Sequence, residues 1–331
     1  MTKVVVTGAT GFVGRAVVPE LIAAGHHVVA LSRAGMPFSG AEVRRIGDFA
    51  SDVDWSQVLH GADAVVHLAA RAHVMRETDS DPIAAYRRVN VDATEALARA
   101  AAAAGIRRFV FASTVKVMGE RSARPFVETD APTPLDAYAN SKWDAERALA
   151  AVAATTGLEV VVIRPPLVYG SGVKGNFLAL LNAIARGLPL PLGAVRNRRS
   201  FIHVGNLAVA LRLALESPQA AGQSYLVRDG EDVSMAELVT RLAEALGTRA
   251  RLFAAPEVLL RLAGRLTGTS DRIARILDSL AVDDGKIRRE LGFVPPMSLA
   301  RGLAETAAWF RAARLRGVVP NGPEARRADG V

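Results

Sequence analysis

Tyr138 and Lys142 are the residues whose types and spacing point most directly to chemistry. They lie four positions apart at the start of an alanine-rich helical stretch, so their side chains share one helical face. A free phenol has a pKa of about 10, too high for efficient proton exchange at neutral pH, but a nearby ammonium favours the phenolate and lowers that pKa. We predict that Tyr138 exchanges a proton with the substrate and that Lys142 assists it, either in this way or by holding the ribose hydroxyls of a nicotinamide nucleotide.

Two hydroxyl residues upstream extend this pair. Ser113 and Thr114 follow directly after the strand-like run 109–112, where a hydroxyl can bind a substrate oxygen and turn it toward the tyrosine. A Tyr-x-x-x-Lys spacing by itself is typical of an exposed helix turn. With these hydroxyls and a glycine motif ahead of it, we predict that Tyr138 and Lys142 are catalytic and that a hydroxyl of Ser113 or Thr114 orients the substrate.

A glycine-rich turn near the start of the chain is typical of dinucleotide binding. Three glycines spaced G-x-x-G-x-x-G follow the apolar run 4–7 and precede a helical stretch. The first permits a tight turn, the second lets backbone approach a pyrophosphate, and the third lets the helix pack against the strand. The helix N-terminus offers N–H groups to the phosphates. The predicted cofactor contacts here are Gly8, Thr10, Gly11, Phe12, Val13 and Gly14.

The end of the second strand-like run bears on the choice of cofactor. An Asp or Glu there would bind the adenosine ribose and favour NAD, whereas this sequence has Ser32 and Arg33, which suit a 2′-phosphate. We expect NADP in preference to NAD; the alternative for Arg33 is an ordinary surface position in an arginine-rich chain. Asp48 and Phe49, between the second and third strand candidates, are expected near the adenine.

The composition excludes several classes of function. The chain has 331 residues, 50% of them hydrophobic, a formal net charge of +8 and no cysteine, which excludes disulfides and thiolate sites. The six histidines have no ligand spacing, so we expect no metal. The basic residues are dispersed and aromatic residues make up 5%, which suits an anionic substrate better than nucleic acid.

No targeting or membrane-spanning segment is apparent, and we expect a cytoplasmic protein. The most apolar late region is interrupted by arginines. There we expect a core-facing amphipathic helix rather than a membrane contact. The arginines concerned are Arg261, Arg265, Arg272 and Arg275.

Strand–helix alternation in the first half predicts the elements that position these residues. Short β-branched runs alternate with helical stretches, which is typical of a Rossmann-type α/β fold, a doubly wound parallel sheet with helices on both faces. The strand candidates are residues 4–7, 27–31, 64–68, 109–112 and 160–163, and the helix candidates are 15–24, 56–60, 83–104 and 141–155.

The pattern changes after residue 163. A stretch rich in Gly and Pro is followed by a helix, two further strands and, from Ser234 onward, a mostly helical pattern. These later candidates are helix 177–186, strand 201–204, helix 207–215, strand 224–227 and helix 299–315. We expect an NAD(P)-binding Rossmann domain of residues 1–169 plus about 201–229, a smaller, mostly helical substrate-binding lobe of 170–200 plus about 230–316, and a disordered tail over 317–331.

Together the motifs resemble those of the extended short-chain dehydrogenases/reductases, in the NAD-dependent epimerase/dehydratase family that acts on nucleotide sugars. The matching segments are 7–14, 67–70, Asn90, the Tyr138 and Lys142 pair, 164–170 and 199–204. The resemblance spans residues 1 to about 315. It implies that Thr114 is catalytic together with Tyr138 and Lys142, with Ser113 beside it in contact with the substrate. It also implies that the cofactor contacts include Tyr138, Lys142, Leu68, Ala69, Ala70, Asn90 and Pro165.

The resemblance also implies where a UDP-sugar substrate lies. Asn176, Phe177 and Arg199 correspond to positions that hold the nucleotide diphosphate, and Arg275 is a further candidate. Arginine suits this task because its planar fork pairs with phosphate oxygens in two bonds. Lys116, beside the expected sugar position, either binds substrate or reaches solvent. The family also leads us to expect a homodimer.

The two residues that follow Thr114 distinguish the dehydratases of this family from its other enzymes. Its 4,6-dehydratases have an Asp-Glu pair there, and this chain has Val115 and Lys116, so we predict that it is not a dehydratase. The neighbouring residues resemble a UDP-glucose-4-epimerase-like subgroup that includes 4-keto-reductases.

Two enzyme activities and one non-catalytic role follow from this resemblance. Because an epimerase benefits from retaining NAD, Ser32 and Arg33 favour an NAD(P)H-dependent 4-reductase of a UDP-4-keto-6-deoxy(-N-acetyl)hexose for surface polysaccharide synthesis. The alternatives are a UDP-glucose or UDP-N-acetylglucosamine 4-epimerase with retained NAD, and a non-catalytic Rossmann sensor or assembly subunit.

Overall fold

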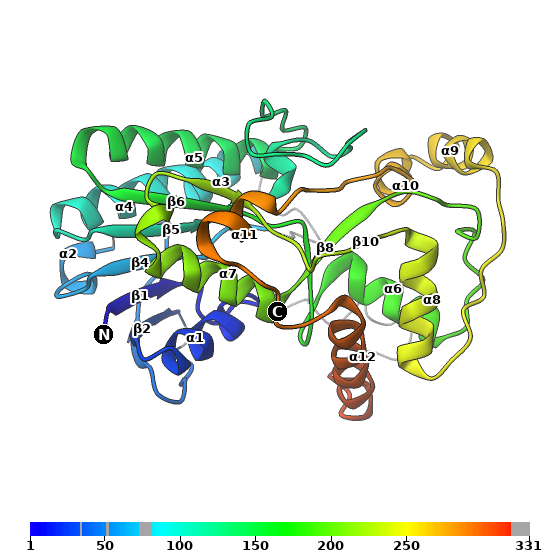
Figure 1. Ribbon diagram of the computed structural model, residues 1–331, viewed down its shortest axis with the longest axis horizontal. Helices are drawn as coiled ribbons and strands as arrows, with labels where there is room; N and C mark the ends of the chain where they lie inside the picture. Colours follow the sequence, from blue (N-terminus) through cyan, green and yellow to red (C-terminus); the bar gives the residue numbers. More distant parts are fainter. Residues whose placement is uncertain (34, 51–52, 73–80, 319–331) are drawn as a thin grey trace.

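A seven-stranded parallel sheet forms the larger part of the protein (Figure 1). The computed structural model describes residues 1–33, 35–50, 53–72 and 81–318, so most of the expected tail lies outside the described residues. The sheet has the order β3-β2-β1-β4-β5-β6-β9, and the predicted Rossmann-type fold is confirmed. Its strands are β1 Lys3–Thr7, β2 His27–Ser32, β3 Glu42–Arg45, β4 Ala64–His67, β5 Arg108–Ala112, β6 Glu159–Arg164 and β9 Ser224–Leu226.

Helices cover both faces of this sheet, because its central strands are apolar on both sides. Val4 and Val6 face helices α1 (Gly14–Ala23) and α7 (Val204–Glu216). Val5, one position out of phase, faces the opposite layer, as the two-residue period of a strand requires. That layer contains α2 Trp55–Val58, α4 Ala93–Ala103 and α5 Ala137–Thr156.

A second, smaller core lies beyond the carboxyl ends of the strands. A three-stranded sheet pairs β7 (Leu167–Tyr169) with β8 (Arg199–His203), and β8 with β10 (Asp232–Val233). Helices α6 Gly175–Ala185, α8 Met235–Leu246 and α12 Leu299–Leu315 pack around Tyr169, Phe177 and Phe310. We call this sheet and these helices, with α9 Glu257–Leu266 and α10 Ser270–Leu277, the small lobe.

The chain passes between the two cores more often than the sequence suggested. The sequence predicts that most residues of β7 and β8 belong to the Rossmann domain. In the structure these two strands pair with each other in the three-stranded sheet of the small lobe. Helix α11 (Gly285–Leu291), expected in the small lobe, instead packs Ile287 and Leu291 into the core of the large sheet. We therefore propose that the protein divides into two units, one around each core, and that the residue boundaries of these units differ from those expected from sequence.

The predicted helix over 83–104 is interrupted by a wider turn. Helix α3 (Pro82–Arg87) leads into a π-helical turn at Arg88–Asp92, and α4 follows. The turn contains Asn90, whose side chain accepts a hydrogen bond from the Arg71 N–H at 2.7 Å and donates to the Ser141 hydroxyl at 2.9 Å. Such bulges often occur at functional sites.

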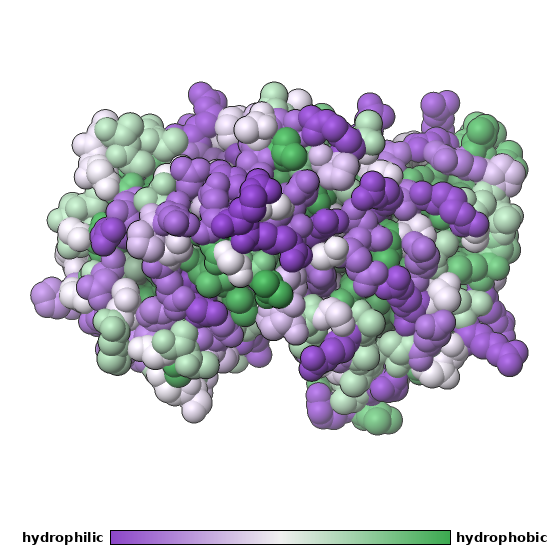
Figure 2. Space-filling view, in the orientation of Figure 1, coloured by the Kyte–Doolittle hydropathy of each residue, from purple (hydrophilic) through white to green (hydrophobic). Residues whose placement is uncertain are grey.

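Helix α9 meets the small-lobe core at its edge, through the half-buried Leu260, as part of the predicted core-facing region. It packs on α10, with Gly264 its only buried residue, because that glycine lets Ile273 approach closely. Val258 and Leu266 are 76% and 81% exposed, and Figure 2 shows apolar atoms at this end of the molecule. Among the described residues, no helix is long and apolar enough to cross a membrane.

Candidate active site

Helix α5 positions the predicted acid–base pair at the carboxyl edge of the sheet. It begins four residues earlier than expected because Asp136 caps it, accepting a hydrogen bond from the Ala139 N–H at 2.7 Å. Tyr138 is half-buried, with its ring centroid 6.3 Å from that of Tyr86. Lys142, one turn later, is 2% exposed, and its Nζ lies 3.9 Å from the centre of the Phe111 ring. The structure therefore places both side chains on the inner side of the helix.

The electrostatics of this pair differ from the prediction. Burial raises the pKa of Tyr138 well above its ordinary value, and the Asp136 carboxylate raises it further. Burial lowers the pKa of Lys142 to about 7, against a smaller opposing effect of Glu146. The expectation that the lysine lowers the phenol pKa was wrong for this structure, because desolvation dominates both groups. Tyr138 is a protonated phenol at neutral pH, and Lys142 exchanges its proton in that range.

The two hydroxyls after β5 have different surroundings. The Ser113 hydroxyl donates to the buried carboxylate of Glu146, so it points into the protein. The Thr114 hydroxyl accepts a hydrogen bond from the Lys116 N–H at 3.3 Å and can still donate to a ligand. Next to them the Pro165 carbonyl accepts from the Val115 N–H at 2.9 Å, which joins this turn to the end of β6. Thr114 is thus the better placed of the two to orient a substrate oxygen.

A buried ion pair that the sequence analysis missed supports this turn. Glu146, one helical turn beyond Lys142, binds Arg164 with an Nη2–Oε2 distance of 2.6 Å, and both side chains are almost fully buried. Glu146 also accepts the Ser113 hydrogen bond. Its four-residue spacing from Lys142 was the only sequence signal. The ion pair ties α5 to the ends of β5 and β6, and so fixes where Tyr138 and Thr114 lie.

The glycine turn after β1 has the close backbone approaches that a dinucleotide site needs. Gly8 has φ of +65°, and a Cβ there would lie 2.7 Å from the Ala69 nitrogen. A Cβ on Gly14 would lie 2.3 Å from the Gly8 oxygen, and the Gly11 N–H donates to that same oxygen at 2.9 Å. Side chains at these positions would fill the turn, so the residues present fit a bound dinucleotide. Of the other predicted contacts, Val13 precedes α1, and Phe12 packs against the small-lobe core.

The end of β4 is held to the glycine turn by Thr7. Its hydroxyl accepts hydrogen bonds from the N–H groups of Leu68 and Ala69, both at 3.1 Å. The same hydroxyl donates a hydrogen bond to His67 Nδ1 at 2.6 Å. The His67 Nε2–H group therefore donates to the Thr94 hydroxyl, at 2.9 Å. Burial lowers the pKa of His67 well below its usual value, so this histidine is neutral and structural. Ala70, the last residue of this motif, is half-buried.

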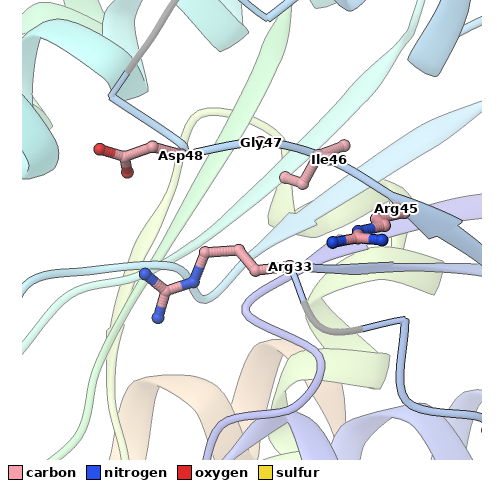
Figure 3. Close-up of a pocket in the computed structure, with 5 residues that line it drawn as sticks. All are labelled: Arg33, Arg45, Ile46, Gly47 and Asp48. Carbon is pink, nitrogen blue, oxygen red and sulfur yellow. The ribbon is translucent and has the colours of Figure 1, made fainter. Parts of the chain in front are cut away.

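A shallow cavity of about 460 Å³ lies at the ends of β2 and β3 (Figure 3). Its lining includes the predicted Arg33 and Asp48 and also Arg45, the last residue of β3, which the sequence analysis missed. Arg45 is the register partner of Ser32, so Arg33 and Arg45 line the cavity from two adjacent strand ends. Ser32 is buried and its hydroxyl accepts from the Met36 N–H at 3.3 Å. The Phe49 ring is a core group stacked on His67, which leaves only its backbone for a cofactor.

The predicted phosphate-binding arginines are committed to contacts within the chain. Arg199 donates through Nη1 to the carbonyls of Arg275 and Asp278, at 2.6 and 3.0 Å. Burial lowers the pKa of Arg199, and nearby Asp278 and Glu120 oppose that effect. The Arg275 side chain binds Glu120, with an Nε–Oε2 distance of 3.2 Å. These contacts orient both guanidinium groups, and their binding of a diphosphate stays a prediction.

The other predicted substrate residues, Phe177, Asn176 and Lys116, lie in three different environments. Phe177 is a core residue of the small lobe, with its ring centroid 5.6 Å from that of Tyr169. Asn176, its neighbour on α6, is exposed. Lys116 binds two carboxylates, Glu120 at 2.8 Å and Asp136 at 2.5 Å. Contact of these residues with a substrate stays a prediction, and no group of metal-ligating side chains occurs among the described residues.

Comparison with known proteins decides the family. The model of the NAD dependent epimerase/dehydratase family matches residues 4–227. The chain belongs to this family. As an epimerase/dehydratase family member, it is an enzyme of the short-chain dehydrogenase/reductase type related to those that act on nucleotide sugars, and that prediction is confirmed.

Full-length relatives include two 4-epimerases. A UDP-glucose 4-epimerase of Vibrio cholerae is 38% identical over 318 residues, which cover 95% of this chain and 97% of the relative. The N-acetyl-alpha-D-glucosaminyl-diphospho-ditrans,octacis-undecaprenol 4-epimerase of Escherichia coli O157:H7 is 30% identical, covering 92% of this chain and 94% of the relative. The solved structure of MoeE5 in complex with UDP-glucuronic acid and NAD superimposes with a TM-score of 0.76 at 32% identity, over 94% of this chain and 99% of MoeE5.

Proposed function

We propose that this enzyme transfers a hydride at C4 of a UDP-hexose, as an NAD(P)H-dependent 4-reductase of a UDP-4-keto-6-deoxy(-N-acetyl)hexose. The observation that carries the proposal is the half-buried Tyr138 phenol at the first turn of α5, one turn before the buried Lys142, in a chain of the epimerase/dehydratase family. Tyr138, Lys142 and Thr114 face the carboxyl edge of the sheet, which is where open α/β sheets bind their ligands.

The protonated state of Tyr138 favours reduction of a ketone over oxidation of an alcohol as the first step. When bound, the nicotinamide supplies the hydride. The oxygen of a reduced ketone needs a proton, and the raised pKa of Tyr138 keeps that proton on the phenol at neutral pH. Thr114 can donate a second hydrogen bond to the same oxygen, and Lys142, with its pKa lowered to about 7, can return a proton to the tyrosine.

The cavity at the ends of β2 and β3 supports NADP as the cofactor. Arg33 and Arg45 both line it, and their side chains lie on one side of the 46–48 segment (Figure 3). Two guanidinium groups at this position suit the second phosphate of NADP, and a cofactor that dissociates after each turnover suits a reductase. The solved relative MoeE5 contains NAD, which makes the choice of cofactor a direct test.

A second candidate is a UDP-sugar 4-epimerase that retains NAD. It is favoured by the 38% identity to the Vibrio cholerae UDP-glucose 4-epimerase along almost the whole of both chains. Both reactions use the same hydride transfer at C4 and the same tyrosine. They differ in whether the cofactor is consumed.

The test follows from that difference. Purified protein is given a UDP-4-keto-6-deoxy sugar with NADPH or NADH, and separately UDP-glucose or its N-acetyl form with no added cofactor. We expect one NAD(P)H consumed for each keto-sugar reduced. Interconversion of the UDP-hexoses without added cofactor would overturn the reductase and establish the epimerase.

Tyr138→Phe is the control in both assays, because it removes only the proton-carrying oxygen. We expect turnover to fall by roughly 10²- to 10⁴-fold. Unchanged turnover would contradict both reactions as written and would revive a non-catalytic role. The homodimer, the cytoplasmic location and the role in surface polysaccharide synthesis stay predictions.

A further inference from the structure

Four charged side chains meet beside the N-terminus of α5, and we call them the 116–275 cluster. Lys116 and Glu120 come from the turn after β5, Asp136 caps α5, and Arg275 comes from α10 of the small lobe. The Lys116 ammonium lies 2.8 Å from Glu120 and 2.5 Å from Asp136. The Arg275 guanidinium lies 3.2 Å from Glu120 and 3.6 Å from Asp136. Two cations therefore balance two carboxylates at the boundary between the two cores.

Asp136 is the member that links this cluster to the proposed acid. One of its carboxylate oxygens accepts from the Ala139 N–H at 2.7 Å and so begins the helix that contains Tyr138. The other oxygen receives the Lys116 ammonium. The position of Lys116 is therefore coupled, through one carboxylate, to the turn of helix on which Tyr138 lies.

We propose that Lys116 is a positioning residue for Tyr138, which it serves by holding and neutralising Asp136, and that it does not bind the sugar nucleotide. This inference rests on the proposed role of Tyr138. An ammonium with two carboxylate partners can bind substrate only by leaving both, and Arg275 alone would then face two negative charges. Such a rearrangement breaks two ion pairs in a half-buried site.

The charges around Tyr138 determine the sign of the effect. Its own helix contributes Asp136 and Lys142, and α3 contributes Tyr86, with the Arg71 guanidinium 5.5 Å from the Tyr86 ring centre. The turn after β5 contributes Lys116 and Glu120, and α10 contributes Arg275. Asp136 is the acidic group that raises the Tyr138 pKa. Without the Lys116 ammonium that carboxylate is less well balanced, so the phenol becomes a weaker acid.

Lys116→Met tests the proposal in steady-state assays. We expect kcat to fall about tenfold, because the phenol becomes a weaker acid, and KM for the sugar nucleotide to change by less than about twofold. Lys116→Arg should restore most of the activity, because a guanidinium keeps the charge. Asp136→Asn should keep kcat at or above the wild-type value, since its amide oxygen can still cap the helix without the negative charge.

The double variant Lys116→Met with Asp136→Asn gives the sharpest result. If the lysine acts through the carboxylate, removing both should return kcat to within about twofold of the wild-type value. Lys3→Met is a matched control at the amino edge of the sheet, where the ammonium donates to the His60 carbonyl at 3.1 Å. Thermal unfolding of each variant shows whether it has folded, and Asp136→Asn alone still tests the proposal if Lys116→Met does not fold.

A large rise in KM with an unchanged kcat would overturn the proposal and make Lys116 a substrate ligand. A kcat of the double variant as low as that of Lys116→Met, a kcat of Asp136→Asn about tenfold below the wild type, or no change in any parameter of Lys116→Met would overturn it as well. These outcomes are distinct from failure of the proposed function, which Tyr138→Phe reports. If that variant is inactive while Lys116→Met behaves as wild type, only the present inference fails.

Discussion

Lys142 is a buried amine whose protonation opposes folding. Its pKa is lowered to about 7 in the folded protein, whereas a lysine in an unfolded chain has a pKa of about 10.4. Between these values the unfolded chain binds a proton that the folded protein does not, so the free energy of unfolding rises with pH. We expect the wild type to gain more stability between about pH 7 and about pH 9 than Lys142→Met does. Urea unfolding of both proteins at the two pH values checks this, and equal gains would contradict the buried, neutral amine.

Arg33 and Arg45 give a second prediction at the scale of single residues. If both bind the 2′-phosphate, replacing both with Ala should raise KM for NADPH by roughly ten- to a hundredfold and leave KM for NADH nearly unchanged. Arg99→Ala is a suitable control, because this exposed arginine on α4 forms an ion pair with Glu95, away from the cavity residues. Equal losses with the two cofactors would mean that the cavity binds some other group.

Single residues also show what the sequence left undetermined. The sequence suggests Arg199 and Arg275 as phosphate-binding residues, but it does not predict which groups of the chain they bind. Arg199 binds the carbonyl of a residue 76 positions later, and Arg275 binds Glu120, 155 positions earlier. Contacts of this range depend on the packing of the small lobe against the turn after β5. Tyr138 and Lys142, in contrast, are neighbours through local helix geometry, which is why their pairing was predictable.

At the scale of elements, the strands were the easiest part to predict. Buried parallel strands are continuous apolar runs, and the strand candidates differ from the observed bounds by no more than a residue or two at either end. The start of α5 was placed too late because it depends on a single capping side chain, Asp136. The π-helical turn at Arg88–Asp92 was missed because it depends on Asn90 reaching Arg71 and Ser141, a tertiary contact.

The Glu146–Arg164 ion pair makes a prediction for the elements that it joins. Glu146→Gln or Arg164→Met leaves one charge buried without its partner, so each should lower the free energy of unfolding by about 3–5 kcal/mol. The double variant Glu146→Leu with Arg164→Met should lose less than the two single changes together, because no buried charge remains. Urea unfolding measures all three. Strictly additive losses would show that the pair does not couple α5 to β6.

At the scale of the whole molecule, the two cores share one chain that alternates between them. Residues up to Ile163 build the large core, and Tyr169–Val195 enter the small one. The chain then returns to the large core at Ile202, leaves it again after Val227, and enters it once more at Ile287. Neither core is a continuous stretch of sequence. This alternation explains why the sequence pattern after residue 163 showed that the fold changes there but did not show which core each later element joins.

Because of this alternation we expect the two cores to unfold together. Trp55 and Trp143 report on the layer that contains α2 and α5, and Trp309 reports on α12. Variants that retain Trp309 alone, or the other two alone, should give urea unfolding curves with the same midpoint by fluorescence. Separate midpoints would show that the small lobe opens independently of the sheet.

The alternation also limits how such a protein can change over generations. A recombination event exchanges one contiguous piece of a gene, and every contiguous piece that encodes the small lobe with its own sheet also encodes α7, β9 and α11 of the large core. A segment taken from a relative would therefore bring part of the large core with it, so the two cores have to change together.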